Sequence, residues 1–333
     1  MTDLHPIPPG TRDILPDEMR ELRALESALC QVFEARGYGQ VATPAIEYDE
    51  VLARGDKRAS SAAYRFFDER GDLLAMRTDM TIPIARVVST RYAGAEPPLR
   101  FFYLGAAYRT VRPQRAQLRE FMQAGVELIG AEAPDGTAEV IEVLCEALDA
   151  AGLGSAVIGL GDADLYRQLL TELDVDDERR ARILDRLAAH DLVGLAVEVG
   201  ELEPLGTGRR DTLLKLPNLR GGREILDRAK EIGGDAVERA TSRLQATYDE
   251  LEKRGVADRV QLDLGLLRDL GYYTGAILEV YDPALGHILG GGGRYDKLLG
   301  RYGRDLPAVG FALYLERLHL AQAEEQRIHE EEK

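Results

Sequence analysis

The sequence predicts an α+β fold in which one antiparallel sheet is flanked by helices and interrupted by a helical insertion. Two observations support this prediction. Strand-like segments occur in the first half of the chain and again after residue 259, and most of them alternate apolar and polar residues or are rich in β-branched and aromatic side chains. Between residues 162 and 259 the sequence is instead charged and rich in Leu and Ala, which is typical of helices.

The first predicted element is a helix that starts at Pro16. Its apolar positions, from Leu22 to Phe33, recur at helical spacing and end near Gly37. A second helix, TAEVIEVLCEALDAAG, ends at Gly152, because glycine readily adopts the left-handed conformation that closes a helix. Strands are expected at residues 40–43, 72–77, 99–109 and 123–128.

The helical insertion is expected at about residues 165–256, inside one sheet domain that spans residues 1–325. Its helical segments include ERRARILDRLAAHDL and GGDAVERATSRLQATYDELEKRG. Strand signals return after it in VQLDLGLL, GYYTGAILEVYD and GHILGGGGRYD. Residues 326–333 carry the charged sequence QRIHEEEK and are expected to form a frayed tail.

Composition and charge exclude several classes of function. The chain has 333 residues, 45% hydrophobic and 30% charged, and no apolar run approaches the roughly 20 residues that a membrane-spanning helix needs. Because no basic and then apolar signal region opens the sequence, we expect a cytoplasmic protein without a membrane partner. The 42 basic and 58 acidic residues give a net charge of −16, which argues against nucleic acid as the main partner, since phosphate backbones favour Lys- and Arg-rich faces.

No metal or cofactor site is expected. Cys30 and Cys145 lie in helical segments without a CxxC or Cys/His neighbour, so we expect them to pack in the core. The five histidines are scattered and lack the spacing of metal ligands. The glycines at residues 290–293 lack the following Gly-Lys-Ser/Thr of a phosphate-binding loop; they more simply allow two backbones, or a backbone and a small ligand, to approach closely.

The strongest functional signal is a set of polar residues inside otherwise apolar segments. They are Asp79, Thr81, Arg109, Gln123, Glu127, Arg268, Tyr272 and Tyr273. Polar groups at such positions must be paired or must bind a ligand. Each one alone fits a structural ion pair, but together they supply guanidinium groups for a carboxylate, and acids and hydroxyls for an ammonium group or a ring N–H. The set predicts a site for a zwitterion with a polar side chain.

These same segments resemble the catalytic core of class II histidyl-tRNA synthetases, from about residue 6 to residue 320. GYGQVATPAIE resembles motif 1, AYRTVRPQRAQLREFMQAGVELIG resembles motif 2 with its loop, and PAVGFALYLERL resembles motif 3. LLRDLGYYTG and GGGGRYDKLLG are similar to the histidine-specific blocks. The resemblance implies a class II aminoacyl-tRNA synthetase-like sheet and a homodimer with Pro44 at its interface.

The resemblance also implies a role for each member of the polar set. Asp79, Thr81 and Gln123 would hold the ammonium group of histidine. Arg109 and Arg268 would face its carboxylate. Glu127, Tyr272 and Tyr273 would address the imidazole. The resemblance therefore implies a largely intact histidine pocket.

Other positions depart from the synthetase pattern. Val111 replaces an acid on the ATP side of motif 2, Tyr314 replaces a small residue in motif 3 although Arg317 remains, and Gly271 replaces an acid in a histidine-specific block. The pattern RTDMT stands where the synthetases have Arg-Pro-Glu-Gly-Thr. These departures, with Tyr314 expected to crowd the nucleotide site, argue against adenylation. The sequence ends at Lys333 without room for an anticodon-binding domain, so we expect no tRNA partner.

The RTDMT pattern is similar to that of a non-synthetase branch, the ATP phosphoribosyltransferase regulatory subunits. This resemblance implies a non-catalytic regulatory subunit that assembles with the short-form catalytic subunit in the first step of histidine biosynthesis, with histidine as the feedback inhibitor. Two alternatives remain open. One is a free-standing histidine-activating ligase that forms histidyl-adenylate, favoured by the retained arginines. The other is a structural scaffold with a relic pocket.

Overall fold

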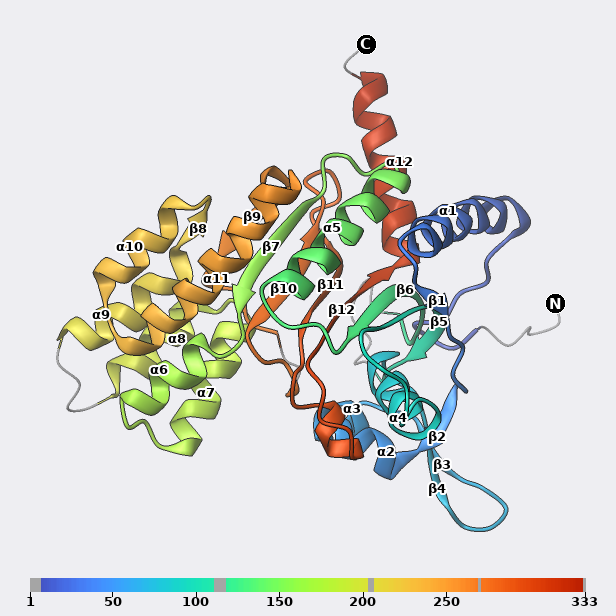
Figure 1. Cartoon of the computed structure of the whole chain (residues 1–333), viewed down its shortest axis with the longest axis horizontal. Coiled ribbons are helices and arrows are strands. Elements are labelled where there is room, and N and C mark those ends of the chain that lie inside the picture. The colour runs from blue at the N-terminus through green and yellow to red at the C-terminus, as the bar shows by residue number, and fades with distance from the viewer. Residues whose placement is uncertain (1–6, 111–117, 203–206, 269–270, 332–333) are drawn as a thin grey trace, which may run out of the picture.

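The computed structural model describes residues 7–110, 118–202, 207–268 and 271–331, and a large sheet forms its centre (Figure 1). The strands of this sheet are β1 (Gly39–Gln40), β5 (Leu99–Tyr108), β6 (Glu120–Ile129), β7 (Val157–Asp162), β8 (Arg220–Gly221), β9 (Val260–Asp263), β10 (Ala276–Tyr281), β11 (Ile288–Arg294) and β12 (Ala308–Tyr314). Their order across the sheet is β1-β5-β6-β12-β11-β10-β7-β9-β8. The central pairs are antiparallel, as predicted, whereas β1–β5 and β7–β9 are parallel.

A small antiparallel sheet lies beside the large one. It consists of β2 (Ile46–Tyr48), β4 (Leu73–Met76) and β3 (Arg65–Phe67), in the order β2-β4-β3. Its outer part projects as a hairpin at the lower right of Figure 1. The buried guanidinium of Arg77, just after β4, donates to the backbone oxygens of Thr43 and Ala106, so the small sheet is fixed to the large one.

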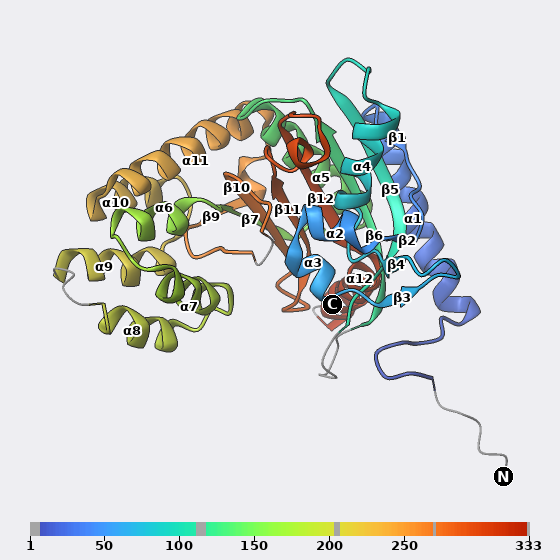
Figure 2. The same ribbon diagram turned by 90° about the horizontal axis from the view of Figure 1, so that it is seen from below.

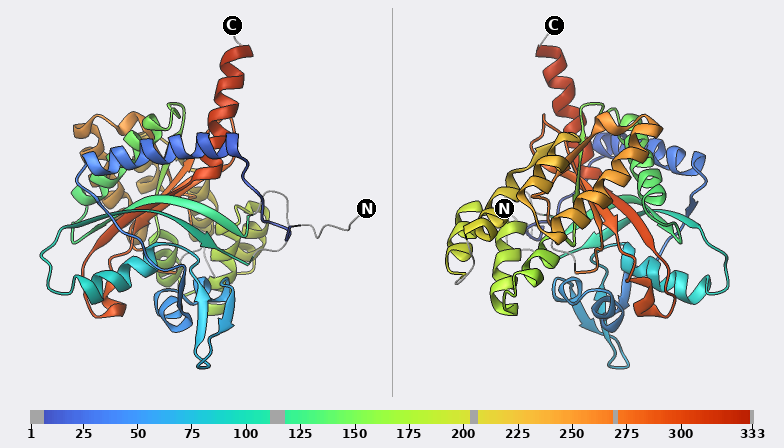
Figure 3. Two further views of the ribbon diagram at one scale, coloured as in Figure 1. Left: turned by 90° about the vertical axis from the view of Figure 1, so that its right-hand side faces the viewer. Right: turned by 60° about the vertical axis from the view of Figure 1, so that its left-hand side comes forward.

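One face of the large sheet is covered by α1 (Pro16–Ala35), α5 (Asp135–Ala150) and α12 (Leu315–Glu331) (Figure 3). The predicted apolar stripe of α1 is confirmed, because Leu22, Leu25, Leu29 and Phe33 are buried. Strand β6 sends alternate residues into this core, among them Val126, as its two-residue period requires.

The opposite face is covered by α2 (Asp49–Gly55), α3 (Lys57–Ser61), α4 (Thr81–Arg91) and the short 3₁₀ helix η3 (Leu299–Tyr302) (Figure 2). A second hydrophobic core lies between these helices and the sheet, and it includes Met80, Ile82, Tyr103 and Tyr295. The sheet therefore separates an apolar core on one side from a core rich in tyrosine on the other.

The chain between β7 and β9 forms the helical lobe at the left of Figure 1. Its helices are α6 (Leu165–Glu172), α7 (Asp177–Ala188), α8 (Leu192–Gly200), α9 (Thr207–Lys215), α10 (Glu224–Ile232) and α11 (Asp235–Arg254), with 3₁₀ turns η1 (Leu216–Asn218) and η2 (Ala257–Arg259). The long α11 packs against α5, α6 and β7 and returns the chain to the sheet. Across the part of the chain that the structure describes, no helix is long and apolar enough to cross a membrane.

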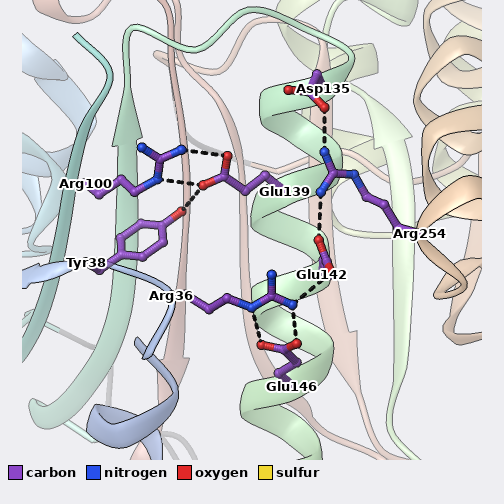
Figure 4. Close-up of polar contacts among 8 residues, drawn as sticks. All are labelled: Arg36, Tyr38, Arg100, Asp135, Glu139, Glu142, Glu146 and Arg254. Atoms are coloured by element: carbon purple, nitrogen blue, oxygen red, sulfur yellow. Dashed lines mark hydrogen bonds and ion pairs between the residues drawn. The ribbon is translucent and has the colours of Figure 1, made fainter. Parts of the chain in front are cut away.

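A row of acidic side chains on α5 ties the lobe to the rest of the fold (Figure 4). The acids recur at helical spacing on one face of α5 and pair with arginines from three other elements. Arg36 at the end of α1 donates to Glu142 (2.8 Å), and Arg254 at the end of α11 donates to the same carboxylate (2.7 Å). Arg100 of β5 forms a two-point pair with Glu139. The network holds α1, β5 and α11 against α5.

Three local features differ from the sequence expectations. Strand β7 was not predicted, and the strand expected at residues 40–43 is limited to Gly39–Gln40. The charged tail expected to fray from residue 326 is helical through Glu331, because Arg327 pairs with Glu324 and with Glu331 one turn away. Cys145 is buried and Cys30 is half-buried, and both are free thiols.

Candidate functional site

A pocket lies on the tyrosine-rich face of the large sheet, between the sheet and the start of α4. Seven of the eight predicted polar residues line it: Asp79, Thr81, Arg109, Gln123, Arg268, Tyr272 and Tyr273. The eighth, Glu127, lies beside them, because its carboxylate accepts a hydrogen bond from the Thr81 hydroxyl (2.7 Å). The fold thus brings together residues that are up to 194 positions apart in the sequence.

The two-residue period of the strands explains this convergence. Gln123 and Glu127 lie four residues apart on β6 and therefore face the same side of the sheet. Their partners across the ladder are Tyr314 and Gly310 of β12. Thr81 is the first residue of α4, so the helix start lies directly above the sheet at this point.

Glu127 is almost fully buried, with 1% of its surface exposed. Thr81 and the hydroxyl of Tyr295 both donate hydrogen bonds to its carboxylate. Burial raises the pKa of Glu127 to about 8; the two hydrogen bonds oppose that shift, and the neighbouring charge of Asp79 adds to it. Glu127 is therefore a carboxyl group that a cationic or N–H donor ligand would ionise.

Asp79 adds a second buried acid. Burial raises its pKa, while the backbone N–H of Ile82, at 3.0 Å, and the charge of Arg109 oppose the shift. Gln123 is 3% exposed, and its side-chain oxygen Oε1 has no hydrogen-bond partner within the described chain. A buried acceptor of this kind is rare in native structures, and it suits an ammonium donor.

Arginines form the other part of the pocket. Arg109 donates from Nε to the Thr78 oxygen (3.0 Å), and its guanidinium stacks over the ring of Phe121 at 5.2 Å. Arg268 donates to the Leu278 oxygen (3.3 Å) and lies 3.9 Å from the Glu279 carboxylate. Both guanidinium groups line the cavity, where they can bind a carboxylate.

Glycines make room for these side chains. A Cβ added at Gly291 would overlap the Arg268 guanidinium, and one added at Gly310 would overlap the Glu127 carboxylate. The expected close approach of two backbones at residues 290–293 is observed, because backbone oxygens of neighbouring strands lie against these glycines, and at Gly291 the Arg268 guanidinium approaches as well. The lining residues enclose a small cavity of about 30 Å³, so a ligand as large as an amino acid requires some of them to move outward.

Sequence reasoning missed two tyrosines of the site. Tyr295 donates to Glu127, and the Tyr103 hydroxyl donates to the Phe311 oxygen (3.3 Å). Tyr295 directly follows the GGGGR segment, so its place in a histidine-specific block was a usable signal. Tyr103 lies in a strand in which an aromatic residue is an ordinary core residue. Tyr314, singled out in motif 3 as a residue that would crowd the nucleotide site, lines the cavity.

The positions that depart from the synthetase pattern have distinct surroundings. The backbone N–H of Gly271 donates to the buried Asp56 carboxylate at 3.0 Å, so an acid at position 271 would face another acid. Tyr314 packs among pocket residues, and Val111 lies outside the described residues. Within the described ranges, no group of three or more His, Cys, Asp or Glu side chains is placed to hold a metal ion.

The chain is similar to known proteins over most of its length. Residues 10–318 match the family described as histidyl-tRNA synthetase. The chain is 40% identical to an ATP phosphoribosyltransferase regulatory subunit from Desulforamulus reducens, over 94% of this chain and 78% of that protein. It is 41% identical to another protein of that name from Moorella thermoacetica, over 96% and 82%.

Two solved structures have folds similar to that of this chain. A protein from Bacillus halodurans, described as an ATP phosphoribosyltransferase regulatory subunit/histidyl-tRNA synthetase, matches with a TM-score of 0.89 and 31% identity, over 96% of this chain and 84% of that one. A histidine–tRNA ligase subunit from Alicyclobacillus acidocaldarius matches with a TM-score of 0.84 and 29% identity, over 98% and 99%.

Proposed function

The chain belongs to the histidyl-tRNA synthetase family and, within it, to the ATP phosphoribosyltransferase regulatory subunits, and we propose that it senses histidine for that enzyme. It assembles with the short-form catalytic subunit, in a complex built on a homodimer of this chain, and takes no part in the transfer reaction itself. Histidine bound in the pocket lowers the activity of the partner. The chain acts in the cytoplasm and does not bind tRNA.

The distribution of charge in the pocket is the observation that carries this proposal. One end of the pocket is marked by Glu127, which lies opposite Gly310 of β12. The other end is marked by Tyr314, four residues further along β12, which lies beside Arg109 and Arg268. Four residues of strand correspond to about 13 Å, enough to separate the two ends of an amino acid. The acids and Gln123 suit the ammonium group and the imidazole, and the arginines suit the carboxylate.

Feedback control requires more than binding. Histidine must bind the inhibited assembly more tightly than the active one, typically by roughly 1–3 kcal/mol. The pocket is suited to such a difference, because Thr81 in α4 and Glu127 in β6 are joined across it by a hydrogen bond. A shift of α4 relative to the sheet in one assembly would change that contact and the affinity for histidine.

The direct test measures phosphoribosyl transfer by the short-form catalytic subunit, with and without this chain, across a histidine titration. We expect this chain to be required for inhibition. Arg268→Ala should abolish inhibition while assembly, followed by size-exclusion chromatography, is retained. The matched control is Arg327→Ala, which removes an exposed arginine of α12 far from the pocket lining.

Three outcomes would contradict the proposal. Unchanged inhibition in Arg268→Ala would place the sensor elsewhere. Absence of histidine binding, both to the chain and to its complex, would leave a structural scaffold with a relic pocket. Histidine-dependent exchange between ATP and pyrophosphate would instead identify a histidine-activating ligase.

A further inference from the structure

Tyr314, the residue that departs from the synthetase pattern in motif 3, lies in the pocket. It is the last residue of β12, directly across the ladder from Gln123, and it lines the cavity together with Arg109 and Arg268. None of the roles assigned to the eight predicted residues involves it. Its ring lies at the end of the pocket where the arginines gather.

The ring of Tyr314 is fixed on two sides. The Arg317 guanidinium lies over its face at 4.7 Å, and the ring of Phe121 meets it edge-on at 5.5 Å. Arg317 is itself anchored, since it donates to the Ile288 oxygen at 2.6 Å. The Arg109 guanidinium in turn lies over the Phe121 ring at 5.2 Å. The cation–π contact with Arg317 and the edge contact with Phe121 together hold the Tyr314 ring in place.

The hydroxyl of Tyr314 lies in a strongly positive environment. Burial opposes its ionisation, but the charges of Arg109, Arg268 and Arg317 outweigh burial and lower its pKa, and Arg109 also lies within hydrogen-bonding reach of the phenol oxygen. A phenol oxygen accepts as well as donates hydrogen bonds, so it joins the arginines in a group of donors that suits an anion. This end of the pocket is complementary to a free carboxylate.

We propose that Tyr314 closes the carboxylate end of the pocket, so that the site accepts histidine with a free carboxylate and rejects histidine whose carboxylate carries a further group. The inference rests on the proposed function and adds the ligand class that the pocket selects. A substituent bonded to the carboxylate would have to pass through the position of the stacked ring. It would also replace the negative charge that the arginines bind.

The same contacts oppose binding of a nucleotide beside the histidine site. A planar base gains binding energy by stacking on the face of a guanidinium or an aromatic ring. The ring of the chain's own Tyr314 already lies against the Arg317 guanidinium, with Phe121 at its edge. Adenylation of bound histidine is therefore opposed by a side chain that occupies the space and not only by missing polar contacts.

Calorimetry with three ligands tests this inference: L-histidine, L-histidine benzyl ester, and the sulfamoyl analogue of histidyl-adenylate. In the unaltered protein, the two extended ligands should bind about 100-fold more weakly than histidine, the loss expected for charge-assisted hydrogen bonds together with a steric conflict. We call the ratio of the affinity for histidine to that for the extended ligands the affinity gap. Tyr314→Ala should narrow this gap by about tenfold or more, because the ring is gone. Tyr314→Phe should keep most of it, because the ring remains.

Controls separate a local effect from a folding defect. Tyr48→Ala removes an exposed tyrosine ring outside the pocket and should leave the gap unchanged. If Tyr314→Ala fails to fold by thermal melting, Arg317→Ala replaces it, since removing the stacked guanidinium frees the ring and should narrow the gap in the same direction.

The outcomes distinguish this inference from the function on which it rests. If the unaltered protein binds no histidine, the histidine-sensor proposal fails and the role of Tyr314 fails with it. If histidine binds but the gap is absent, or stays the same in Tyr314→Ala and Arg317→Ala, only the role of Tyr314 is overturned.

Discussion

Ionisation of Glu127 should make histidine binding depend on pH. Burial raises the pKa of this carboxyl to about 8, and an imidazole N–H or a cationic ligand needs the ionised form as its acceptor. With that pKa, about one-tenth of the pockets carry ionised Glu127 at pH 7 and about half at pH 8. Histidine affinity should therefore rise by about fivefold over this interval, with release of a proton on binding.

The assay is calorimetric titration with histidine at pH 7 and pH 8, in two buffers that differ in ionisation enthalpy. Released protons make the observed enthalpy depend on the buffer. Glu127→Gln keeps the size of the side chain and its acceptor oxygen but cannot ionise, so its affinity should be lower and its pH slope flatter. Histidine's own titration contributes equally to both proteins, so the difference between their slopes isolates Glu127. Equal slopes in the two proteins would refute this reasoning.

Further predictions concern stability and indirect effects on the pocket. The pKa of Glu127 is raised in the folded state above its ordinary value of 4.5, so between about pH 4.5 and pH 8 the folded protein holds a proton that the unfolded chain has lost. The free energy of unfolding should therefore fall as pH rises through this range, by up to about 1.4 kcal/mol per pH unit. Urea unfolding at pH 5.5 and 7.5 should show this decline, with a smaller decline in Glu127→Gln. The Cβ of an alanine at position 291 would meet both the Arg268 guanidinium and the Leu278 backbone oxygen, so Gly291→Ala should displace Arg268 and weaken histidine binding by about tenfold or more. Unaltered affinity in a folded variant would contradict the assigned position of Arg268. Arg254→Ala should leave Glu142 with one partner and lower the free energy of unfolding by about 1 kcal/mol, given the partial exposure of the pair, and the loss should shrink in 0.5 M salt; the same loss at high salt would point to packing and not to charge.

The parts of the fold that the sequence predicts are those with a clear period or a strand-like composition. Helix α1 repeats its buried leucines at helical spacing, and β5 and β6 are ten-residue strands made mostly of apolar residues, with four aromatic side chains in β5. Strand β7 was missed because almost every residue in it is buried, which removes the alternation, and because it contains Gly159 and Gly161. A Cβ at Gly161 would press on the Asp263 oxygen, so the glycine that obscures the pattern is required by close strand packing.

Contacts between segments far apart in the sequence are the part of the site that sequence patterns do not predict. Gln123 and Glu127 could be recognised because each is a polar residue in a buried strand. The hydrogen bond from Tyr295 to Glu127 joins residues 168 positions apart, and nothing local in either segment specifies it. The edge contact of Tyr314 with Phe121 is equally dependent on the register between β6 and β12. Sequence reasoning therefore picked out the polar groups, Tyr272, Tyr273 and Tyr314, but not Tyr103 and Tyr295, whose hydroxyls contact distant segments.

The burial of these polar groups in one place has a physical consequence. Glu127 and Asp79 are carboxyl groups buried in a core, with pKa values raised by burial, and each makes the folded state less stable at neutral pH than an apolar residue would. In a sequence that is otherwise consistent with its fold, buried carboxyl groups that lower stability occur chiefly where a ligand compensates for their cost. A zwitterion with a cationic group supplies that compensation at the acids, and its carboxylate does the same for the arginines at the other end. The residues that cost stability without a ligand are thus the ones that the proposed ligand would satisfy.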